Sequence, residues 1–241
     1  MNSNEDKLVM AALSAGASLA GTASLETLRD LPSYGGVDLS SFKSAVSYCV
    51  ALPDYAVDLI TVRDPGNLYA WAYKTANMLL DQIGMRVAGA VAELGGKALA
   101  VPSSLRIDPE REVGNVSHKA FALAAGLGWI GRNGLFIAPK FGPRVRLGTV
   151  LTDLPLRSGT PMENQCGDCR ICIDSCPSKA IKYAEFRFRP GAREDIFDPK
   201  KCSSRLSENK ELLSKKPGMA DYAVTVCGVC IKVCPYGGTK L

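Results

Sequence analysis

The sequence predicts an α/β domain followed by a small cysteine-rich module. Helical and strand-like patterns alternate through the first 160 of the 241 residues, and eight of the nine cysteines fall between Cys166 and Cys234. A stretch containing Pro, Gly and Ser, residues 155–165, separates the two regions. With 46% hydrophobic residues, the chain can bury one substantial core and carry a second module. We therefore expect domains at residues 1–160 and 161–241.

The elements of the first domain follow from apolar periodicity. Residues 45–52 form an apolar run, interrupted only by Ser47, that stops before Pro53, which is typical of a buried strand. Apolar side chains recur near helical spacing from residue 67 to 94 and stop at two glycines, which predicts a long helix. In chain order, we expect a helix over 5–18, a strand over 45–52, a helix over 67–94, a strand over 98–101 and a helix over 116–125.

Cys49 is the one cysteine outside the module, and it falls in the middle of the strand expected over residues 45–52. No basic residue stands near it in the sequence to lower the pKa of its thiol. We interpret it as a small core residue, with a catalytic thiol as the alternative.

Nothing in the sequence indicates a membrane span or an export signal. The longest apolar stretch, residues 8–21, falls short of the 18 or more residues that a spanning helix needs. Residues 1–7 lack a basic start followed by an apolar stretch, and they carry no twin-arginine motif. We expect a cytoplasmic protein that does not contact the membrane.

A glycine motif at residues 126–131 matches GxGxxG, the dinucleotide fingerprint, but in an inverted context. That fingerprint needs a strand before it and a helix after it, so that phosphate meets the helix amino terminus. Here a helix precedes the motif, and a strand is expected over 134–138. We interpret Gly126 as a carboxy-terminal helix cap. The sequence also lacks GxxxxGK[ST], which argues against a P-loop ATPase.

The cysteine spacing is typical of two 4Fe-4S clusters. The first run is CxxCxxCxxxCP, and the second, CxxCxxxCP, lacks a first cysteine nearby. In such runs the cysteine before proline ligates the other cluster, and Cys202 is the cysteine left to complete the second set. The pairing suggested is Cys166, Cys169, Cys172 and Cys234 for one cluster, and Cys202, Cys227, Cys230 and Cys176 for the other.

Structural zinc and disulfides are the alternatives for these cysteines. Structural zinc usually takes two cysteine pairs separated by a long gap, and a third cysteine followed by xxxCP does not fit that pattern. Disulfide frameworks belong to small secreted chains, and no secretion signal is present. Iron-sulfur ligation is the interpretation that we favour.

The positive charge is concentrated beside the cysteines. The net charge is +5; residues 1–165 carry 15 Lys and Arg against 15 Asp and Glu, and residues 166–241 carry 14 against 9. Two oxidised clusters of about 2− each would bring the total to about +1. Charge compensation therefore explains the excess, with a surface for tRNA or an acidic partner as the alternative.

Residues 117–156 resemble a segment of the superfamily of epoxyqueuosine reductases and corrinoid reductive dehalogenases. The likeness is specific in AGLGWIGRNGL, in RVRLGTVLTDLPL, and in the cysteine layout with its isolated Cys202. The resemblance implies a nitroreductase-like α/β sandwich that binds base-off cobalamin, followed by a ferredoxin-like module that delivers electrons to cobalt. This chain looks like a compact member, because no helical-repeat domain follows Cys234.

The resemblance also implies site residues. An aspartate that donates a proton in epoxyqueuosine reductases falls by spacing near Glu112, and Asp108 is the nearest aspartate. His118, the single histidine, is a second candidate proton donor, with a structural hydrogen-bonding role as its alternative. The candidate cobalamin contacts are Gly128, Trp129, Arg132, Asn133, Gly134 and Arg144. For Arg132, Asn133 and Arg144 the alternative is a solvated loop residue.

Two functions from different classes follow. The first is a cobalamin-dependent iron-sulfur reductase, for which epoxyqueuosine in tRNA is the nearest known substrate. The second is an electron-transfer protein that reduces a separate corrinoid protein or enzyme. A bound flavin is a third possibility for the first domain. We expect ferredoxin or flavodoxin as electron donor, and tRNA or a corrinoid protein as partner.

Overall fold

A computed structural model describes residues 3–238 of the chain, and these fall into two compact units that are each discontinuous in sequence. The sheet unit comprises the residues up to Ala51, Asn77–Trp129 and Arg146–Met162. The cysteine unit comprises Leu52–Ala76, Ile130–Val145 and the residues from Glu163 onward. The break at residues 162–163 lies close to the expected boundary, and two earlier segments of the chain complete the cysteine unit.

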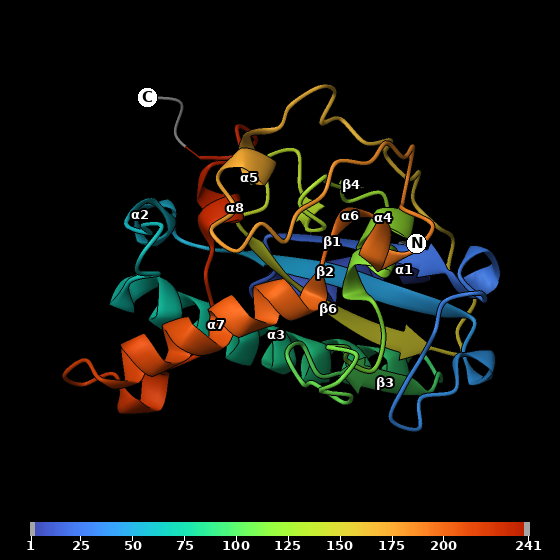
Figure 1. Ribbon diagram of the computed structural model, residues 1–241. Helices are drawn as coiled ribbons and strands as arrows, with labels where there is room; N and C mark the ends of the chain where they lie inside the picture. The colour runs from blue at the N-terminus through green and yellow to red at the C-terminus, as the bar shows by residue number, and fades with distance from the viewer. Residues whose placement is uncertain (1–2, 239–241) are drawn as a thin grey trace. The chain divides into compact units, whose positions relative to one another are not determined.

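A four-stranded sheet, in the order β1-β2-β6-β3, forms the centre of the sheet unit (Figure 1). β1 and β2 pair antiparallel with Leu19 opposite Cys49, and β3 and β6 pair antiparallel with Ala98 opposite Thr152. The strands are β1 (Leu19–Ser24), β2 (Ser44–Ala51), β3 (Ala98–Val101) and β6 (Val145–Thr152).

One face of this sheet packs against the second half of α3 (Asn67–Glu93). Tyr48 of β2 reaches that helix, and its buried hydroxyl donates a hydrogen bond to the carbonyl of Leu80 at 3.1 Å. Two glycines leave room for the ring, because a Cβ on Gly148 would lie 2.3 Å from it and one on Gly84 would lie 2.7 Å from its hydroxyl. The close approach of helix and sheet therefore depends on these glycines.

The opposite face packs against α4 (His118–Ala124). Phe121 of this helix is fully buried with Ala23, Ala45 and Leu151 of the sheet. Since side chains alternate between the faces of a strand, Ala45 and Tyr48 point to opposite sides. Helices on both faces make this a mixed α/β unit, as expected, and its assignment as nitroreductase-like stays a prediction.

Three of the predicted elements, β2, α3 and β3, are confirmed to within one residue, but the first helix is shorter than expected. α1 spans Asn4–Ser14, and the prediction was wrong for residues 15–18. Gly16 has a φ of +109°, which ends the helix, and the chain then enters β1 at Leu19. Pairing with β2 overrides the helical pattern there.

The cap predicted at Gly126 is confirmed. Its φ is +71°, its N–H donates to the carbonyl of Leu123 at 3.0 Å, and the N–H of Leu127 donates to Ala122 at 3.1 Å. These are the two bonds of a Schellman motif, which ends α4. The strand expected over 134–138 is β5 (Phe136–Ile137), which pairs with β4 (Trp129–Ile130).

Short helices dominate the cysteine unit. The longest helix wholly within it is α7 (Pro199–Ser214), and the side chain of Asp198 caps it by accepting from the N–H of Lys201 at 3.0 Å. The other elements are α2 (Asp54–Asp58), α5 (Ile171–Asp174), α6 (Arg193–Ile196), α8 (Val229–Lys232) and the 3₁₀ turns Leu25–Thr27, Leu39–Ser41 and Ala220–Tyr222, the first two in the sheet unit. Among residues 3–238, no helix is long and apolar enough to cross a membrane.

Candidate metal centre

The two cysteine motifs fold alike. In each, a short helix begins two residues after a cysteine, Cys169 or Cys227, and Cys172 of α5 and Cys230 of α8 are each the second residue of their helix. The two helices contact each other. Gly228 takes a left-handed φ of +79° before α8, where a Cβ would lie 2.6 Å from the side chain of Ile60. The repeated spacing in the sequence therefore produces a repeated local structure.

Four thiols of the first predicted ligand set surround one pocket. Burial and, to a smaller extent, the nearby thiols of Cys166, Cys234 and Cys169 together raise the pKa of Cys172 to about 11. The pocket lining combines these cysteines with residues of the β4–β5 hairpin and of the chain after α8. It comprises Cys166, Cys169, Cys172, Cys234, Arg132, Asn133, Ile137, Pro235 and Tyr236.

The thiols of the second predicted set also influence one another. Burial raises the pKa of Cys230 far above its usual value, and the thiols of Cys227, Cys202 and Cys176, followed by that of Cys172 from the first set, act in the same direction. Cys202 reaches this group from the first turn of α7. Eight thiols in two groups of four, each group drawing on both motifs, suit two 4Fe-4S clusters. Iron binds thiolates, so cluster binding would reverse these raised pKa values.

Cys176 differs from the other ligands, because hydrogen bonds at its sulfur lower the pKa of its thiol. The N–H of Ala180 lies 3.3 Å from the sulfur, and the hydroxyl of Ser178 lies 3.6 Å from it. Burial raises the pKa of this thiol, but these hydrogen bonds outweigh burial and lower it. The cysteine that crosses to the second group is therefore the one best prepared as a thiolate. The spacing of the cysteines did not indicate that Ser178 would contact the sulfur of Cys176.

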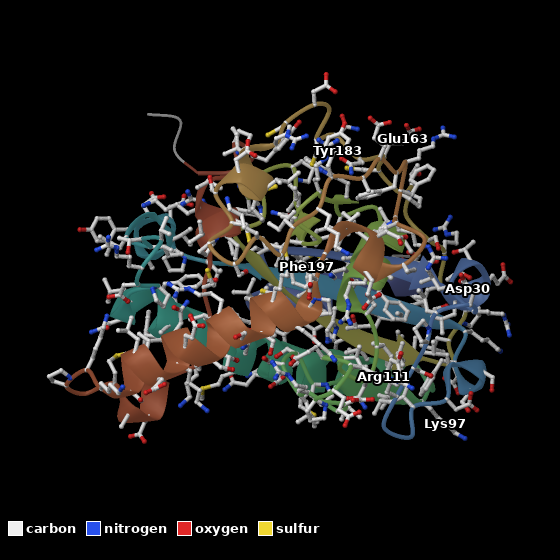
Figure 2. All side chains as sticks on the ribbon, in the orientation of Figure 1. Asp30, Lys97, Arg111, Glu163, Tyr183 and Phe197 are labelled. Atoms are coloured by element: carbon white, nitrogen blue, oxygen red, sulfur yellow. The ribbon has the colours of Figure 1, made fainter. Side chains whose placement is uncertain are left out.

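Arg132 anchors the loop that carries the first two cysteines. Its guanidinium donates to the carbonyl of Cys169 at 2.9 Å and to that of Gly167 at 2.7 Å, and its backbone N–H lies 3.4 Å from the sulfur of Cys166. The guanidinium also stacks on Tyr183, 4.2 Å from the ring centre. Figure 2 shows Tyr183 on the segment between α5 and α6.

Asn133 and Arg144 hold other parts of the cysteine unit together. Asn133 donates to the carbonyl of Cys230 at 3.4 Å and accepts from the N–H of Leu135 at 3.1 Å. Arg144 pairs with Asp54 at 3.0 Å and with Asp58 at 2.7 Å. Neither sequence nor spacing identified these partners.

The residues expected to contact cobalamin are therefore largely engaged by protein. Arg132, Asn133 and Arg144 are only 4–5% exposed, and their terminal nitrogens bond to protein oxygens. Their terminal nitrogens are therefore already engaged and not open to the amides or phosphate of a corrin. Gly134, with a φ of +71°, forms the β4–β5 turn, and Gly128 and Trp129 are buried. Cobalamin contact stays a prediction for all six residues.

His118 has both ring nitrogens engaged within the sheet unit. Nε2 donates to the carbonyl of Pro102 at 3.2 Å, and Nδ1 accepts from the hydroxyl of Thr149 at 2.8 Å. Burial, with a smaller contribution from Arg146, lowers the pKa of His118 to about 4. A neutral imidazole with both ring nitrogens hydrogen-bonded favours a structural role over that of a proton donor. Its catalytic role stays a prediction.

Glu112 lies in a strained turn of the sheet unit, with a φ of +55°. Its carboxylate pairs with Arg106 at 3.0 Å. Asp108, the alternative, organises the same loop by accepting from the N–H groups of Glu110 and Arg111, each at 3.0 Å. A local loop function therefore accounts for Asp108, and the catalytic role of Glu112 stays a prediction.

Sequence comparison supports the cluster assignment and the resemblance. The family described as 4Fe-4S double cluster binding domain matches residues 165–237. The epoxyqueuosine reductase of Listeria monocytogenes is 33% identical over 126 residues, which cover 52% of this chain and 31% of that protein. That of Aliivibrio fischeri is 28% identical over 194 residues, which cover 77% of this chain and 47% of that protein.

Solved structures share the fold. A reductive dehalogenase with a suggested mechanism for B12-dependent dehalogenation matches 95% of this chain with a TM-score of 0.69 and 21% identity, and the match covers 31% of that protein. The epoxyqueuosine reductase from Streptococcus thermophilus matches 95% with a TM-score of 0.59 and 21% identity, covering 65% of that protein. The predicted resemblance to this superfamily is confirmed, although the chain spans only about a third of the first curated relatives.

Proposed function

We propose that this chain is an iron-sulfur oxidoreductase in which two 4Fe-4S clusters relay electrons to a corrinoid-bound active site. The observation that carries the proposal is the gathering of eight thiols in two groups of four. The similarity to epoxyqueuosine reductases, over 52% of this chain for one and 77% for another, supports a reductase. When bound, the clusters would accept and pass on single electrons.

The chain's own residues prepare the cluster sites. Arg132 fixes the carbonyls of the loop between Cys166 and Cys169, and the side-chain oxygen of Asn164 accepts from the N–H of Cys166 at 2.8 Å. Ser178 and Ala180 stabilise the thiolate form of Cys176. These contacts hold ligands in place before the metal arrives, which lowers the cost of ordering the loops.

Cobalamin and the substrate belong to the same proposal. A neighbour of similar fold is described as acting by B12-dependent dehalogenation, and another was solved with an epoxyqueuosine-modified stem loop of tRNA-Tyr. We propose cobalamin as the electron acceptor, and epoxyqueuosine in tRNA as the first substrate to test.

A second candidate is a relay that reduces a separate corrinoid protein. The protein partners of Arg132, Asn133 and Arg144 favour it, because these side chains are occupied where corrin contacts were expected. In this case the sheet unit would serve as a docking module.

Three measurements on anaerobically purified protein test these proposals. We expect about eight irons per chain with broad absorbance near ~400 nm, and a chain without iron would contradict both candidates. Retention of hydroxocobalamin through gel filtration would support the reductase. Release of a yellow flavin from the protein would instead identify flavin, not cobalamin, as its cofactor. Turnover of epoxyqueuosine tRNA by the protein with a chemical reductant alone would exclude the relay.

A further inference from the structure

We propose that Arg132 is a positioning residue that raises the reduction potential of the first cluster, the one held by Cys166, Cys169, Cys172 and Cys234. This role differs from the cobalamin contact expected for Arg132 from the sequence. The inference rests only on the two-cluster part of the proposed function, and it concerns no residue outside the cysteine unit.

The placement of Arg132 carries the first step. It lines the pocket that the four thiols surround, and its side chain is almost completely buried. Its terminal nitrogens bond to the carbonyls of Gly167 and Cys169, on either side of Asp168 in the ligand loop. A shift of the guanidinium would therefore move two ligands, Cys166 and Cys169, together.

An unsatisfied donor carries the second step. The Nε of Arg132 is buried and has no hydrogen-bond partner among the described residues. A buried N–H without an acceptor costs about 1–3 kcal/mol, so such groups usually have a partner in the functional state. Because Arg132 lines the thiol pocket, a sulfur of the bound cluster is the acceptor we assign to it. Hydrogen bonds to cluster sulfurs raise the reduction potential.

The third observation is the charge environment of Arg132, which differs from that of the other arginines near the ligand thiols. Two other arginines act on ligand thiols: Arg144 on that of Cys234 and Arg205 on that of Cys227. Both are paired with carboxylates, Arg144 with Asp54 and Asp58, and Arg205 with Glu208.

Arg132, in contrast, meets only neutral groups in the described part of the chain. These are two carbonyls and the ring of Tyr183. Its positive charge therefore stays uncompensated beside the first cluster, in a site where burial weakens solvent screening.

The redox consequence follows from electron balance. A cluster with four thiolates carries about 2− when oxidised, and one electron from a low-potential donor takes it to about 3− with no bond made or broken. A fixed positive charge stabilises the reduced state more than the oxidised one. Loss of the charge from Arg132 should therefore make the first cluster harder to reduce.

The test is an EPR-monitored redox titration of the holoprotein, with dithionite as reductant. In Arg132→Gln we expect the midpoint potential of the first cluster to become more negative, while that of the second stays at its wild-type value. Cys202→Ala identifies the clusters, because loss of one ligand leaves a three-iron centre at the second site with a distinct EPR spectrum. The four-iron signal that remains then belongs to the first cluster.

Two variants separate charge from hydrogen bonding and provide a matched control. Arg132→Lys keeps the charge but removes Nε and the forked bonds, so we expect a smaller negative shift than in Arg132→Gln. Ser178→Ala removes the hydroxyl beside Cys176 and should shift only the second cluster.

The results that would contradict this inference differ from those that would contradict the proposed function. Equal potentials of the first cluster in wild type and Arg132→Gln, at full iron content, would overturn this inference and leave the two-cluster proposal intact. If Arg132→Gln loses iron, Arg132→Lys decides: an unchanged first-cluster potential in that variant, with both clusters present, would exclude a contribution from Nε. Absence of iron from the wild type would instead contradict the proposed function.

Discussion

Gly142 and Tyr236 lie in direct backbone contact: a Cβ on Gly142 would lie 1.7 Å from the carbonyl oxygen of Tyr236. Gly237 meets the same segment from the other side, where a Cβ would lie 2.2 Å from the carbonyl oxygen of Phe141. Cys234, the fourth ligand proposed for the first cluster, lies two residues before Tyr236. The glycine at 142 therefore determines how closely this ligand can approach the other three.

We predict that Gly142→Ala will selectively weaken the first cluster. The added methyl cannot fit without displacing the backbone that carries Cys234, and its φ of +56° adds strain. Iron content should fall from about eight towards about four per chain. Gly218→Ala is the control, because Gly218 has a φ of +71° but nothing within 4 Å of its added Cβ. Equal iron content in the two variants would contradict the proposed contact.

Two glycine substitutions in the sheet unit should act in opposite directions. Gly148→Ala places a methyl 2.3 Å from the ring of Tyr48 and should destabilise the fold by about 1–3 kcal/mol through overpacking. Gly89→Ala meets nothing within 4 Å in α3 and should stabilise it by about 0.5–1 kcal/mol through helix propensity. Urea unfolding of the two variants measures both effects. Stabilisation by Gly148→Ala would mean that Tyr48 does not pack there.

His118 should make the protein less stable in mild acid. Its pKa is lowered from 6.5 to about 4 in the folded state, so between these values the unfolded chain binds more protons. Stability therefore falls as pH drops from about 6.5 to about 4, by about 1–3 kcal/mol given the half-buried ring. In His118→Gln this part of the pH dependence should disappear, while that of the carboxylates stays. Parallel stability curves for the two proteins between these pH values would refute the shift.

Asn209 should support the second cluster from outside its ligand set. This side chain on α7 is only 2% exposed and donates to the carbonyl of Val226 at 2.8 Å, next to Cys227. Asn209→Ala leaves that carbonyl without its donor, at a cost of about 1–3 kcal/mol. We expect faster loss of iron from the second cluster under a chelator, followed by absorbance. Ser214→Ala, which removes a bond to the carbonyl of Glu211 at the exposed end of α7, is the control.

The elements that could be predicted are those whose pattern is local. The apolar run of β2 and the long periodic stretch of α3 each carry their own signal, and their bounds differ from the prediction by at most one residue. β1 could not be predicted, because Leu19–Ser24 consists mostly of small residues with little strand preference. Its conformation follows from pairing with β2, a contact that the sequence of β1 does not encode.

The candidate site divides in the same way. The eight cysteines were predicted because a cluster demands particular ligands at particular spacings; the four of the first predicted set line one pocket, and the pairing of all eight stays a prediction. The role of Arg132 could not be predicted, because its partners are backbone carbonyls 35 and 37 positions away. Every residue has a backbone carbonyl, so the sequence does not reveal which carbonyls accept a hydrogen bond. A motif can therefore identify ligands without identifying what orients them.

The exchange of one cysteine between the two motifs has a consequence for biogenesis. The first group needs Cys234 from the far end of the second motif, and the second group needs Cys176 from the first. The second four-thiol set is complete only once translation has passed residue 230, and the first only once it has passed residue 234. Iron delivery to this chain should therefore be a late event in its synthesis, and a nascent chain stalled before residue 230 should accept no complete cluster.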